Sequence, residues 1–368
     1  MRIAFDHQIF GWQKYGGISR YYCELASELA NGSEQTVAVI SPFYINEHLR
    51  KASARLQVIG TKVPGYPKAG RPLRALNSML VAPLLRSFHP DIVHETYYST
   101  THHRIKKAKR VLTVFDMIHE RFSDMYSPLD LVRKEKADAV AHADHVICIS
   151  AQTQQDLVNL LGVDPEKTTV VHLGYRLKAG SRTITLPVHA QRPFLLFVGI
   201  RVGYKNFEGM LKAYAASSVL RSAFDIICFG GGAFSYSECA LIQKLGLSAD
   251  HLHQVAGGDG ILAEFYRKAT AFVYPSLYEG FGLPPLEAMS FDCPVVCSGA
   301  SSIPEVVGDA GAFFDPCDID AIRSALELVV SDSAIRRTLI ERGRKRIQQF
   351  SWARCAQETL DVYRKVMI

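Results

Sequence analysis

The chain has 368 residues, 48% of them hydrophobic and 21% charged, a composition typical of a globular protein with enough apolar material for two cores. No apolar run reaches the ~20 residues needed to cross a bilayer. The eight cysteines and thirteen histidines include no Cys-x-x-Cys or His-Glu-x-x-His spacing, so the sequence predicts neither a disulfide framework nor a bound metal.

The net charge of +6 is concentrated in one segment, because residues 47–110 carry 13 basic and 3 acidic side chains. A solvated surface is the plainest interpretation, and contact with anionic lipid, an acidic glycan or nucleic acid is the alternative. Within it, residues 72–90 contain the apolar stretch LNSMLVAPLLRSF. We expect a core-facing helix there, with a membrane-interface helix as the alternative.

The N-terminus, MRIAFDHQIF, predicts a first β-strand, since Asp6 and His7 stand where a signal peptide would be apolar. We therefore expect a cytoplasmic protein, with peripheral contact at the inner face of the membrane left open. Apolar runs then alternate with amphipathic stretches, which indicates βαβ units and parallel sheets. Strands are expected at 36–40, 92–94, 111–115, 145–149, 194–198, 225–229, 271–274 and 294–297, and helices at 19–31, 127–143, 151–161, 206–217 and 320–330.

Polar, turn-rich residues 178–192 interrupt this alternation and are expected to link two domains. The predicted fold class is α/β, with doubly wound Rossmann-like domains at 1–178 and 190–350. Residues 351–368 are expected to form a final amphipathic helix.

Residues 274–289, YPSLYEGFGLPPLEAM, carry the strongest chemical signal. A strand ends, Gly280 and Gly282 allow close approach of a ligand to the backbone, and Pro284-Pro285 opens a helix. The free N–H groups at such a helix start can bind phosphate.

Two glutamates flank this helix start, Glu279 before it and Glu287 within its first turns. Their carboxylates could accept hydrogen bonds from the hydroxyls of a sugar and a ribose. Taken alone, a strand–turn–helix corner with two solvated glutamates is the plainer interpretation.

A second signal follows the predicted strand at 194–198, where Arg201 and Lys205 come after Gly199. Cations at the carboxyl edge of a parallel sheet can neutralise a diphosphate, although, taken alone, cations of a surface loop are the plainer interpretation.

Two weaker signals lie in the first half. Gly16-Gly17 opens the first helix and could bring backbone amides against a phosphate, or simply form a tight turn. Asp116, His119 and Glu120 follow a predicted strand, where ligands collect in such sheets, although a lone histidine is more often structural.

Several motifs are absent from the sequence. There is no phosphate loop, no nucleophile elbow and no dinucleotide fingerprint after the first strand. Asp318-Ile-Asp320 has the spacing of a metal pair, but Asp320 is better explained as the N-cap of the helix that follows.

In this order, the stretches resemble the retaining glycosyltransferases of family 4, which have the GT-B fold. The resemblance covers nearly the whole chain and includes that family's paired-glutamate signature, Glu-x7-Glu. Its stretches are YGGISRYYCELASELA, TVFDMIHERF, VICISAQTQQDL, VGIRVGYKNFEGML, YPSLYEGFGLPPLEAMSFDCPVV and SSIPEVVGDAGAFFDP.

The resemblance implies an active site in a cleft between an acceptor-side first domain, onto which the last helix packs back, and a donor-binding second domain. It assigns Arg201 and Lys205 to the diphosphate, Glu279 to the donor sugar, Glu287 to the ribose, and Gly280, Phe281, Gly282 and Leu283 to backbone contacts with the donor. Gly16 and Gly17 match a loop that closes over the donor, and His119 matches an acceptor-side histidine. Phe115 precedes Asp116 where many members have a His-Asp pair, which leaves His119 as the candidate catalytic histidine.

The implied activity is transfer of a hexose from a nucleotide-diphosphate sugar, with retention, to a glycan or lipid-linked glycan of a cell-surface polysaccharide. No cofactor or metal is expected. A GDP-sugar such as GDP-mannose or GDP-rhamnose is preferred because of the likeness to bacterial polysaccharide mannosyl- and rhamnosyltransferases, and a UDP-sugar is the alternative. A nucleotide-sugar epimerase and a non-catalytic basic protein that binds membrane or nucleic acid are further alternatives, and no nucleic-acid partner is expected.

Overall fold

The computed structural model describes residues 1–32, 34–64, 70–103, 105–127, 129–175 and 192–368. These residues form two compact units, unit 1 (residues 1–174 and 351–368) and unit 2 (residues 175–350). The linker expected at 178–192 falls, except for its last residue, outside the described residues. None of the helices in the described ranges has both the length and the apolar character to cross a bilayer.

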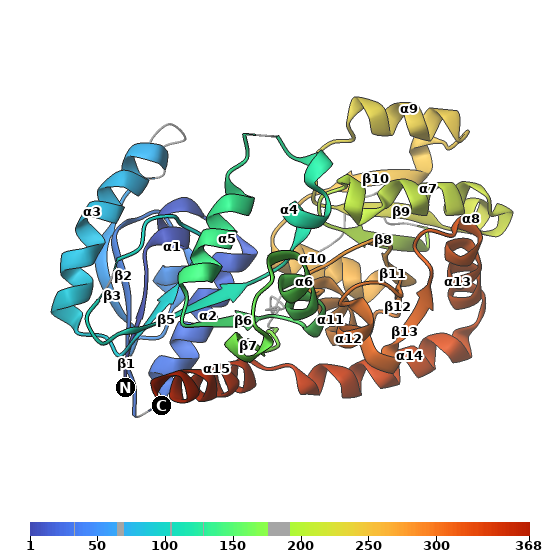
Figure 1. Cartoon of the computed structure of the whole chain (residues 1–368). Coiled ribbons are helices and arrows are strands. Elements are labelled where there is room, and N and C mark those ends of the chain that lie inside the picture. Colours follow the sequence, from blue (N-terminus) through green and yellow to red (C-terminus); the bar gives the residue numbers. More distant parts are fainter. Residues whose placement is uncertain (33, 65–69, 104, 128, 176–191) are drawn as a thin grey trace. The chain divides into compact units, whose positions relative to one another are not determined.

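Unit 1 contains a parallel sheet of seven strands in the order β3-β2-β1-β4-β5-β6-β7 (Figure 1). Its strands are β1 (Arg2–Phe5), β2 (Thr36–Tyr44), β3 (Gln57–Lys62), β4 (Ile92–Glu95), β5 (Lys109–Val114), β6 (His145–Cys148) and β7 (Thr168–Val170). Its helices are α1 (Gln8–Trp12), α2 (Gly17–Asn31), α3 (Gly70–Phe88), α4 (Ile118–Arg121), α5 (Val132–His142), α6 (Ala151–Leu161) and α15 (Trp352–Met367).

Unit 2 contains a parallel sheet of six strands in the order β10-β9-β8-β11-β12-β13. Its strands are β8 (Phe194–Val198), β9 (Asp225–Phe229), β10 (Leu252–Val255), β11 (Ala271–Tyr274), β12 (Val295–Ser298) and β13 (Gly311–Phe314). Its helices are α7 (Phe207–Ala215), α8 (Ser218–Ala223), α9 (Tyr236–Lys244), α10 (Asp259–Lys268), α11 (Leu283–Ser290), α12 (Ile303–Val307), α13 (Ile319–Ser331) and α14 (Ser333–Arg346).

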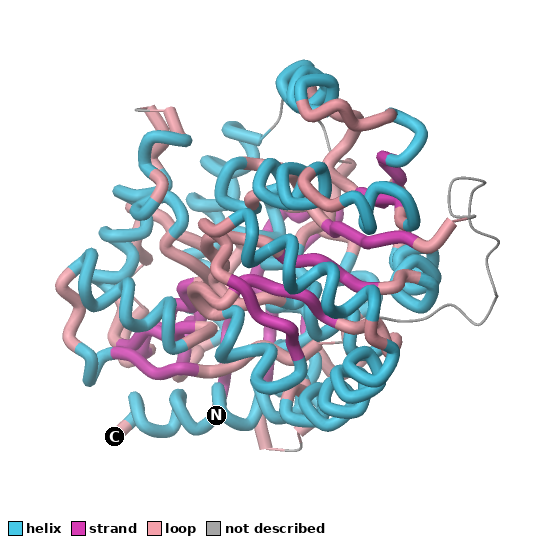
Figure 2. The backbone as a smooth tube through the Cα atoms, turned by 90° about the vertical axis from the view of Figure 1, so that its right-hand side faces the viewer, coloured by secondary structure: helices cyan, strands magenta, loops and turns pink. Residues whose placement is uncertain are grey.

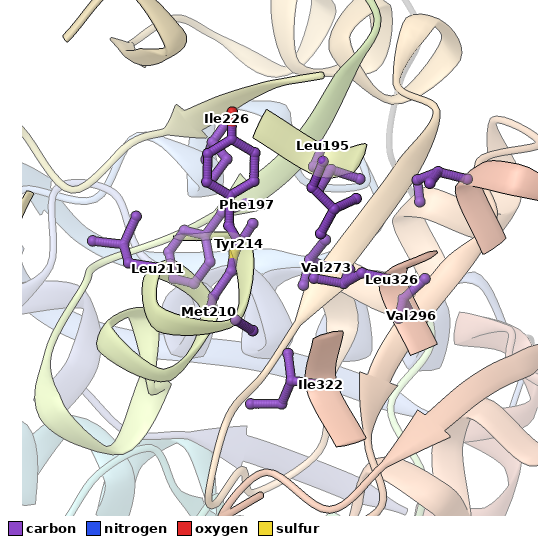
Figure 3. Packing of buried hydrophobic residues seen from close by; sticks show 14 of the residues in the cluster. Leu195, Phe197, Met210, Leu211, Tyr214, Ile226, Val273, Val296, Ile322 and Leu326 are labelled. Carbon is purple, nitrogen blue, oxygen red and sulfur yellow. The ribbon is translucent and has the colours of Figure 1, made fainter. Parts of the chain in front are cut away.

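Both faces of the sheet in unit 2 are covered by helices (Figure 2). Side chains alternate along each strand, so Leu195 and Phe197 of β8 pack on α7 and α13 on one face (Figure 3). Phe194 points to the other face, where its ring lies 6.0 Å from that of Phe265 on α10. Each of these apolar side chains contributes roughly 1.5–3 kcal/mol by its burial. The continuous apolar runs of the sequence reflect this two-sided covering.

Several predicted elements agree with the structure, and the differences have physical reasons. The strands predicted at 194–198, 225–229 and 271–274 match β8, β9 and β11. The helix predicted at 127–143 begins only at Val132, because the Asp130 side chain accepts the Val132 N–H (2.9 Å) and holds a turn. The predictions missed β3, β7, β10 and β13, which are the outermost strands of the two sheets. Edge strands are not covered like central ones and so lack continuous apolar runs.

Helix α3 has a buried side and an exposed side. Val81 and Leu85 are almost fully buried against the sheet, which confirms the core-facing interpretation for this part of the helix. Leu76, Met79 and Leu80 are exposed, Met79 to 75%. A short apolar strip therefore remains on the surface of the basic segment.

The C-terminal helix α15 packs on α2 within unit 1 (Figure 1). Tyr363 of α15 is fully buried, and its hydroxyl lies 2.6 Å from Nδ1 of His94 on β4. Nε2 of His94 lies 2.8 Å from the hydroxyl of Thr113 on β5. Burial lowers the pKa of His94 to about 3, so a neutral imidazole joins α15 to the centre of the sheet.

We predict that His94 makes the stability of the protein depend on pH. The imidazole titrates near pH 6.5 in the unfolded chain, so at lower pH the unfolded chain binds a proton that the folded chain excludes. The stability of wild type relative to His94→Gln should fall by about 2 kcal/mol between about pH 7 and pH 5. Denaturant unfolding of both proteins measures this difference.

The comparison with the variant removes the opposite contribution of Glu95, whose pKa burial raises to about 7 and which is present in both proteins. A difference that does not change with pH would contradict a neutral, buried His94.

Candidate active site

The candidate donor site of unit 2 lies where the strand order reverses. Strands β8 and β11 are neighbours, and the chain moves outward from them in opposite directions across the sheet. The carboxyl ends of such strands are where open α/β sheets bind ligands. The loops that leave these two ends, residues 199–206 and 275–282, carry most of the residues predicted for the donor.

Backbone and side-chain hydrogen bonds join the two loops. The side-chain amide of Asn206 donates to the carbonyls of Pro275 (3.1 Å) and Pro316 (2.8 Å). The N–H of Leu277 donates to the carbonyl of Tyr204 (2.8 Å). Asn206 itself has a φ of 53°, a left-handed conformation that asparagine tolerates better than most residues. The loops are therefore held in register independently of any ligand.

Lys205 and Glu279 form an ion pair between these loops. The Lys205 Nζ lies 2.6 and 2.9 Å from the two carboxylate oxygens, and the side chains are 15% and 9% exposed. The buried Tyr274 hydrogen-bonds the same carboxylate, and burial together with the Glu279 charge raises the pKa of its hydroxyl well above the usual value. The structure thus brings two of the predicted catalytic residues into direct contact.

Two serines after β12 hold the backbone of the glutamate loop. Ser301 and Ser302 both donate to the carbonyl of Glu279 (2.8 Å each), and Ser302 also lies 2.8 Å from the carbonyl of Phe281. Neither was predicted as a site residue. Hydroxyl side chains after a buried strand are visible in the sequence, but the carbonyls that they bind are set by the fold.

The helix start predicted to bind phosphate is present at α11. Gly282 is its N-cap with a φ of 120°, a conformation open to glycine, and prolines occupy the first turn. Prolines remove two of the four N–H groups that lack an acceptor within a helix, which leaves those of Gly282 and Leu283. Glu287, one turn further on, accepts a hydrogen bond from the buried hydroxyl of Tyr266 (3.3 Å).

Arg201 has different partners from Lys205. Its Nε lies 2.6 Å from Glu238, and Nη2 donates to the carbonyls of Gly232 and Ala233 (2.9 Å each). Burial opposes the charge of Glu238, but hydrogen bonds from Arg201 and Ser235 lower its pKa overall. The Arg201 side chain is only 3% exposed and is paired with the Glu238 carboxylate, so a buried ion pair lies at the end of β8.

Three consecutive glycines after β9 make room for Arg201. Gly230, Gly231 and Gly232 have φ values of 86°, 71° and 74°. A Cβ on Gly231 would lie 2.7 Å from a guanidinium nitrogen of Arg201 and 2.8 Å from the carbonyl oxygen of Gly199. These glycines were not predicted as site residues, although a triple glycine directly after an apolar strand is a signal that the sequence contains.

A cavity of about 610 Å³ lies beside Arg201. It is lined by residues of the loop after β8, α7 and α9, and includes Asn206 and Glu238. Lys205, Glu279 and α11 are not part of its lining among the described residues. Of the residues predicted to bind the donor diphosphate, the cavity is therefore lined by Arg201 and not by Lys205.

In unit 1, Gly16 and Gly17 stand at the start of α2 as predicted. Gly16 is the N-cap, and the side-chain oxygen of Gln13 accepts the N–H of Ser19 in the first turn (3.2 Å). A Cβ on Gly16 would lie 2.2 Å from that side-chain oxygen, whereas a Cβ on Gly17 would have open space. Gln13 thus occupies part of the helix start in this structure.

His119 lies on the short helix α4, in unit 1, and the predicted donor residues lie in unit 2. Its ring stacks on Tyr126 (centroids 4.0 Å apart), and Nε2 is 3.6 Å from a carboxylate oxygen of Asp130. Phe115, the departure from the family pattern, packs edge-on against Tyr21 in the core. His119 is therefore oriented by an aromatic ring and a carboxylate.

A buried lysine supports the turn that carries His119. Lys136 of α5 is 1% exposed at its side chain, and its Nζ lies 2.7 Å from Glu120 and 2.9 Å from the carbonyl of Asp116. This ion pair was not predicted, because the sequence does not show that a lysine on an amphipathic helix points inward.

One group of side chains has metal-like spacing within the described residues, namely His102, Asp138 and His142. Nε2 of His102 lies 2.7 Å from Asp138, and its Nδ1 lies 2.7 Å from a guanidinium nitrogen of Arg110. Metal-binding histidines donate the second ring nitrogen to an acceptor, whereas Arg110 can only donate. The geometry favours a hydrogen-bonded network over a metal site.

The Asp-x-Asp pair near the end of unit 2 forms a helix cap. Asp318, not Asp320 as predicted, is the N-cap of α13, and it accepts the N–H groups of Asp320 and Ala321 (2.9 and 3.1 Å). The prediction was wrong by two residues because both aspartates have cap-forming side chains and only the backbone decides between them.

Comparison with known proteins identifies the family of the chain. The group described as Glycosyltransferase Family 4 matches residues 15–178, and the group described as Glycosyl transferases group 1 matches residues 186–346. The chain belongs to the family 4 glycosyltransferases. It is an enzyme of the hexosyltransferase class, and its fold is GT-B, with two Rossmann-like domains.

The relatives include the O-antigen chain mannosyltransferase B of Escherichia coli, which is 29% identical over 372 residues, with 95% of this chain and 96% of that protein covered. The serotype-specific mannosyltransferase WbdA of Escherichia coli is 28% identical over 64% of this chain, which spans 30% of that longer protein. The structure of sucrose-phosphate synthase from Thermosynechococcus elongatus superposes with a TM-score of 0.74 at 21% identity, covering 99% of this glycosyltransferase and 98% of that chain.

We predict that Gly231→Ala destabilises unit 2 more than Gly232→Ala does. Both residues have a similar positive φ, so both variants lose roughly 1–2 kcal/mol through backbone strain. Only Gly231→Ala also forces its methyl group against Arg201 and the Gly199 carbonyl, which adds about 1–3 kcal/mol. Denaturant unfolding of both variants gives the difference, and equal losses would show that the glycine loop does not depend on Arg201.

We predict that Lys136→Met lowers the free energy of unfolding by about 3–5 kcal/mol, because it leaves Glu120 buried without its cation. Lys134→Met, on the exposed side of the same helix, is the matched control and should change stability by about 0.5 kcal/mol or less. Urea denaturation compares them. A loss no larger than that of the control would mean that Glu120 is protonated or hydrated without Lys136.

Proposed function

We propose that this glycosyltransferase transfers a hexose from a GDP-sugar, GDP-mannose or GDP-rhamnose, to a glycan or lipid-linked glycan during synthesis of a cell-surface polysaccharide. The observation that carries the proposal is the Lys205–Glu279 pair at the carboxyl ends of β8 and β11, beside the start of α11. Relatives that are named as O-antigen mannosyltransferases support the choice of sugar and pathway class. A UDP-sugar donor is the alternative.

In this proposal, Lys205 exchanges partners when the donor binds. The diphosphate carries more negative charge than the Glu279 carboxylate, and the flexible lysine side chain can follow it. Glu279, still held by Tyr274 and by its serine-bound backbone, then accepts hydrogen bonds from sugar hydroxyls. In the enzyme without donor, the ion pair thus holds both side chains near the positions that we propose for them in the donor complex.

In the reaction that we propose, positive charge around the leaving group stabilises the transition state. Breaking the bond from the anomeric carbon to phosphate concentrates negative charge on the nucleoside diphosphate. Lys205, the helix start at Gly282 and Leu283, and the buried charge of Arg201 stabilise that charge as it develops. We propose that these groups serve in place of a divalent cation, so that transfer requires no added metal.

Glu279 orients the donor in this proposal and is not the nucleophile. A nucleophilic carboxylate needs a free oxygen directed at the anomeric carbon, whereas the Glu279 carboxylate, once Lys205 has left it, stays hydrogen-bonded to Tyr274 and accepts the sugar hydroxyls. We therefore propose that the acceptor hydroxyl attacks from the side that the diphosphate leaves, that the departing phosphate takes its proton, and that configuration is retained.

Unit 1 supplies the acceptor side in this proposal. His119, oriented by Tyr126 and Asp130, is assigned to the acceptor, and the Gly16-Gly17 helix start to the donor. The exposed apolar strip of α3 lies in the basic segment, which fits peripheral contact with an anionic membrane that presents a lipid-linked acceptor. We propose a cytoplasmic enzyme that makes this contact.

We predict that GDP stabilises the protein more than UDP or ADP does in a thermal-shift assay. Relative to the ligand-free protein, GDP at about 100 times its Kd should add about 2.7 kcal/mol of stability. Among donors, GDP-mannose should then be hydrolysed and transferred fastest. Equal stabilisation by UDP, or greater stabilisation, would replace the GDP-sugar with the UDP-sugar alternative.

The same assay tests the residues. Lys205→Ala and Glu287→Ala should lower transfer at least ~100-fold, as expected when a charge-stabilising or donor-holding group is lost. Lys345→Ala, which removes an exposed lysine of α14 that does not line the cavity beside Arg201, is the control and should transfer at the wild-type rate. A wild-type rate of transfer by Lys205→Ala would overturn the proposed donor site.

A further inference from the structure

Glu238 is the residue that ties Arg201 to the start of helix α9. Its carboxylate is bound from two directions, because Oε1 lies 2.6 Å from Nε of Arg201 and Oε2 accepts the backbone N–H of Ser235 (2.6 Å). The Ser235 hydroxyl in turn accepts the N–H of Glu238 (3.2 Å), so the two residues form a capping box. Glu238 was not predicted as a site residue, because it lies 37 positions from Arg201 in the sequence.

Glu238 is also the counter-charge of Arg201. The two terminal guanidinium nitrogens donate to backbone carbonyls within residues 230–233 at 2.9–3.3 Å, and the guanidinium carbon lies 4.8 Å from the centre of the Phe234 ring. Within the described residues, Glu238 is the one carboxylate at ion-pair distance from Arg201. The neutral contacts orient the guanidinium, and Glu238 supplies the negative charge that a buried cation needs.

Opening this ion pair would cost the two partners differently. The side chain of Glu238 is 17% exposed, and it would keep the Ser235 N–H and its place at a helix start, which favours negative charge. Arg201 is 3% exposed, and it would be left buried without an anion. The pair can therefore open at low cost only when another anion takes the place of Glu238.

The pair borders a cavity and is not enclosed by packed side chains. Arg201, Ser237 and Glu238 line the cavity of about 610 Å³ described above, together with Asn206. Side chains beside such a space can move between staggered rotamers without displacing packed neighbours. The Glu238 carboxylate can thus turn away from Arg201 while α9 stays in place.

We propose that Glu238 is a positioning residue of the donor site, which holds Arg201 in the enzyme without donor and releases it to the diphosphate when the donor binds. The proposal rests on the glycosyl transfer proposed above and on the role given there to Arg201, and it adds the residue that competes for this cation. Because the same competition acts on the nucleoside diphosphate product, Glu238 also favours product release.

Glu238→Gln tests this competition. The amide keeps the size of the side chain and an oxygen for the Ser235 N–H, but it leaves Arg201 without a counter-charge until a phosphate binds. We expect the Kd for GDP, measured by calorimetry, to fall at least about tenfold, since binding no longer breaks a charged hydrogen bond. GDP should dissociate correspondingly more slowly, and guanosine, which has no phosphate, should bind as it does to wild type.

Asp292→Asn is the matched control, because it removes the same charge from another ion pair of unit 2. The two oxygens of Asp292 lie 2.7 and 2.6 Å from nitrogens of Arg344, and Asp292 precedes β12, at the amino end of the strands. This variant should bind GDP and guanosine like wild type. Tighter GDP binding by Asp292→Asn as well would attribute the effect to net charge and overturn the proposal.

The outcomes separate this proposal from the proposed function. If wild type binds neither GDP nor UDP and hydrolyses no nucleotide sugar, the proposed function fails, and the present proposal fails with it. If wild type binds GDP and Glu238→Gln binds it equally or more weakly, Glu238 has only a structural role, and the present proposal alone is overturned. If wild type binds UDP in place of GDP, UDP and uridine are the probes, with the same expected results.

Two further variants keep the test valid if Glu238→Gln does not fold. Glu238→Asp keeps the charge at the start of α9 but is one methylene shorter, so it should tighten GDP binding by a smaller factor. In an Arg201→Gln background, Glu238→Gln should leave the Kd for GDP within about twofold of that of Arg201→Gln alone, because Glu238 acts through Arg201. Unchanged or weaker GDP binding by Glu238→Asp, or a tenfold gain in the Arg201→Gln background, would overturn the proposal.

Discussion

The ion pair between Lys205 and Glu279 is the contact on which the candidate donor site depends. Both side chains are largely buried, and the desolvation of two charges offsets most of their attraction, so the pair adds little net stability. Its effect is positional, because it fixes two loops that leave neighbouring strands. Removing either partner would leave the charge of the other one buried and unpaired. Substitution of only one of the two residues is therefore unfavourable.

The sheet explains why these two residues can meet although they are separated by 74 positions in the sequence. Parallel strands place all their carboxyl ends at one edge, and a right-handed crossover sends each helix to one face or the other. Where the strand order reverses, the loops after β8 and β11 are not followed by helices on the same side, and a gap remains for a ligand. The hydrogen bonds of Asn206, Ser301 and Ser302 then fix the loops that border this gap.

The central part of both sheets could be predicted from the sequence because two-sided burial produces continuous apolar runs, as at residues 194–198. The four edge strands could not be predicted, because their side chains contact solvent as well as the core and do not form continuous apolar runs. At the site, the family resemblance assigned Lys205 and Glu279 to the donor, but nothing in the sequence indicated that they pair. The contacts of Arg201 with the glycine loop, and the inward direction of Lys136, depend on positions that are close only in the folded chain.

The two sheets share one topology, and each carries charged side chains where its strand order reverses. In unit 2 both cations at this point have a carboxylate partner, Lys205 with Glu279 and Arg201 with Glu238. In unit 1 Asp6 and Glu95 lie at the ends of β1 and β4, and Glu95 is paired with Arg110. A buried cation that already has a carboxylate partner is less costly than an unpaired one, and it can exchange that partner for the diphosphate proposed as its ligand. The cores of both units are built in the same way, so the difference between the two edges lies in the few side chains at the strand ends.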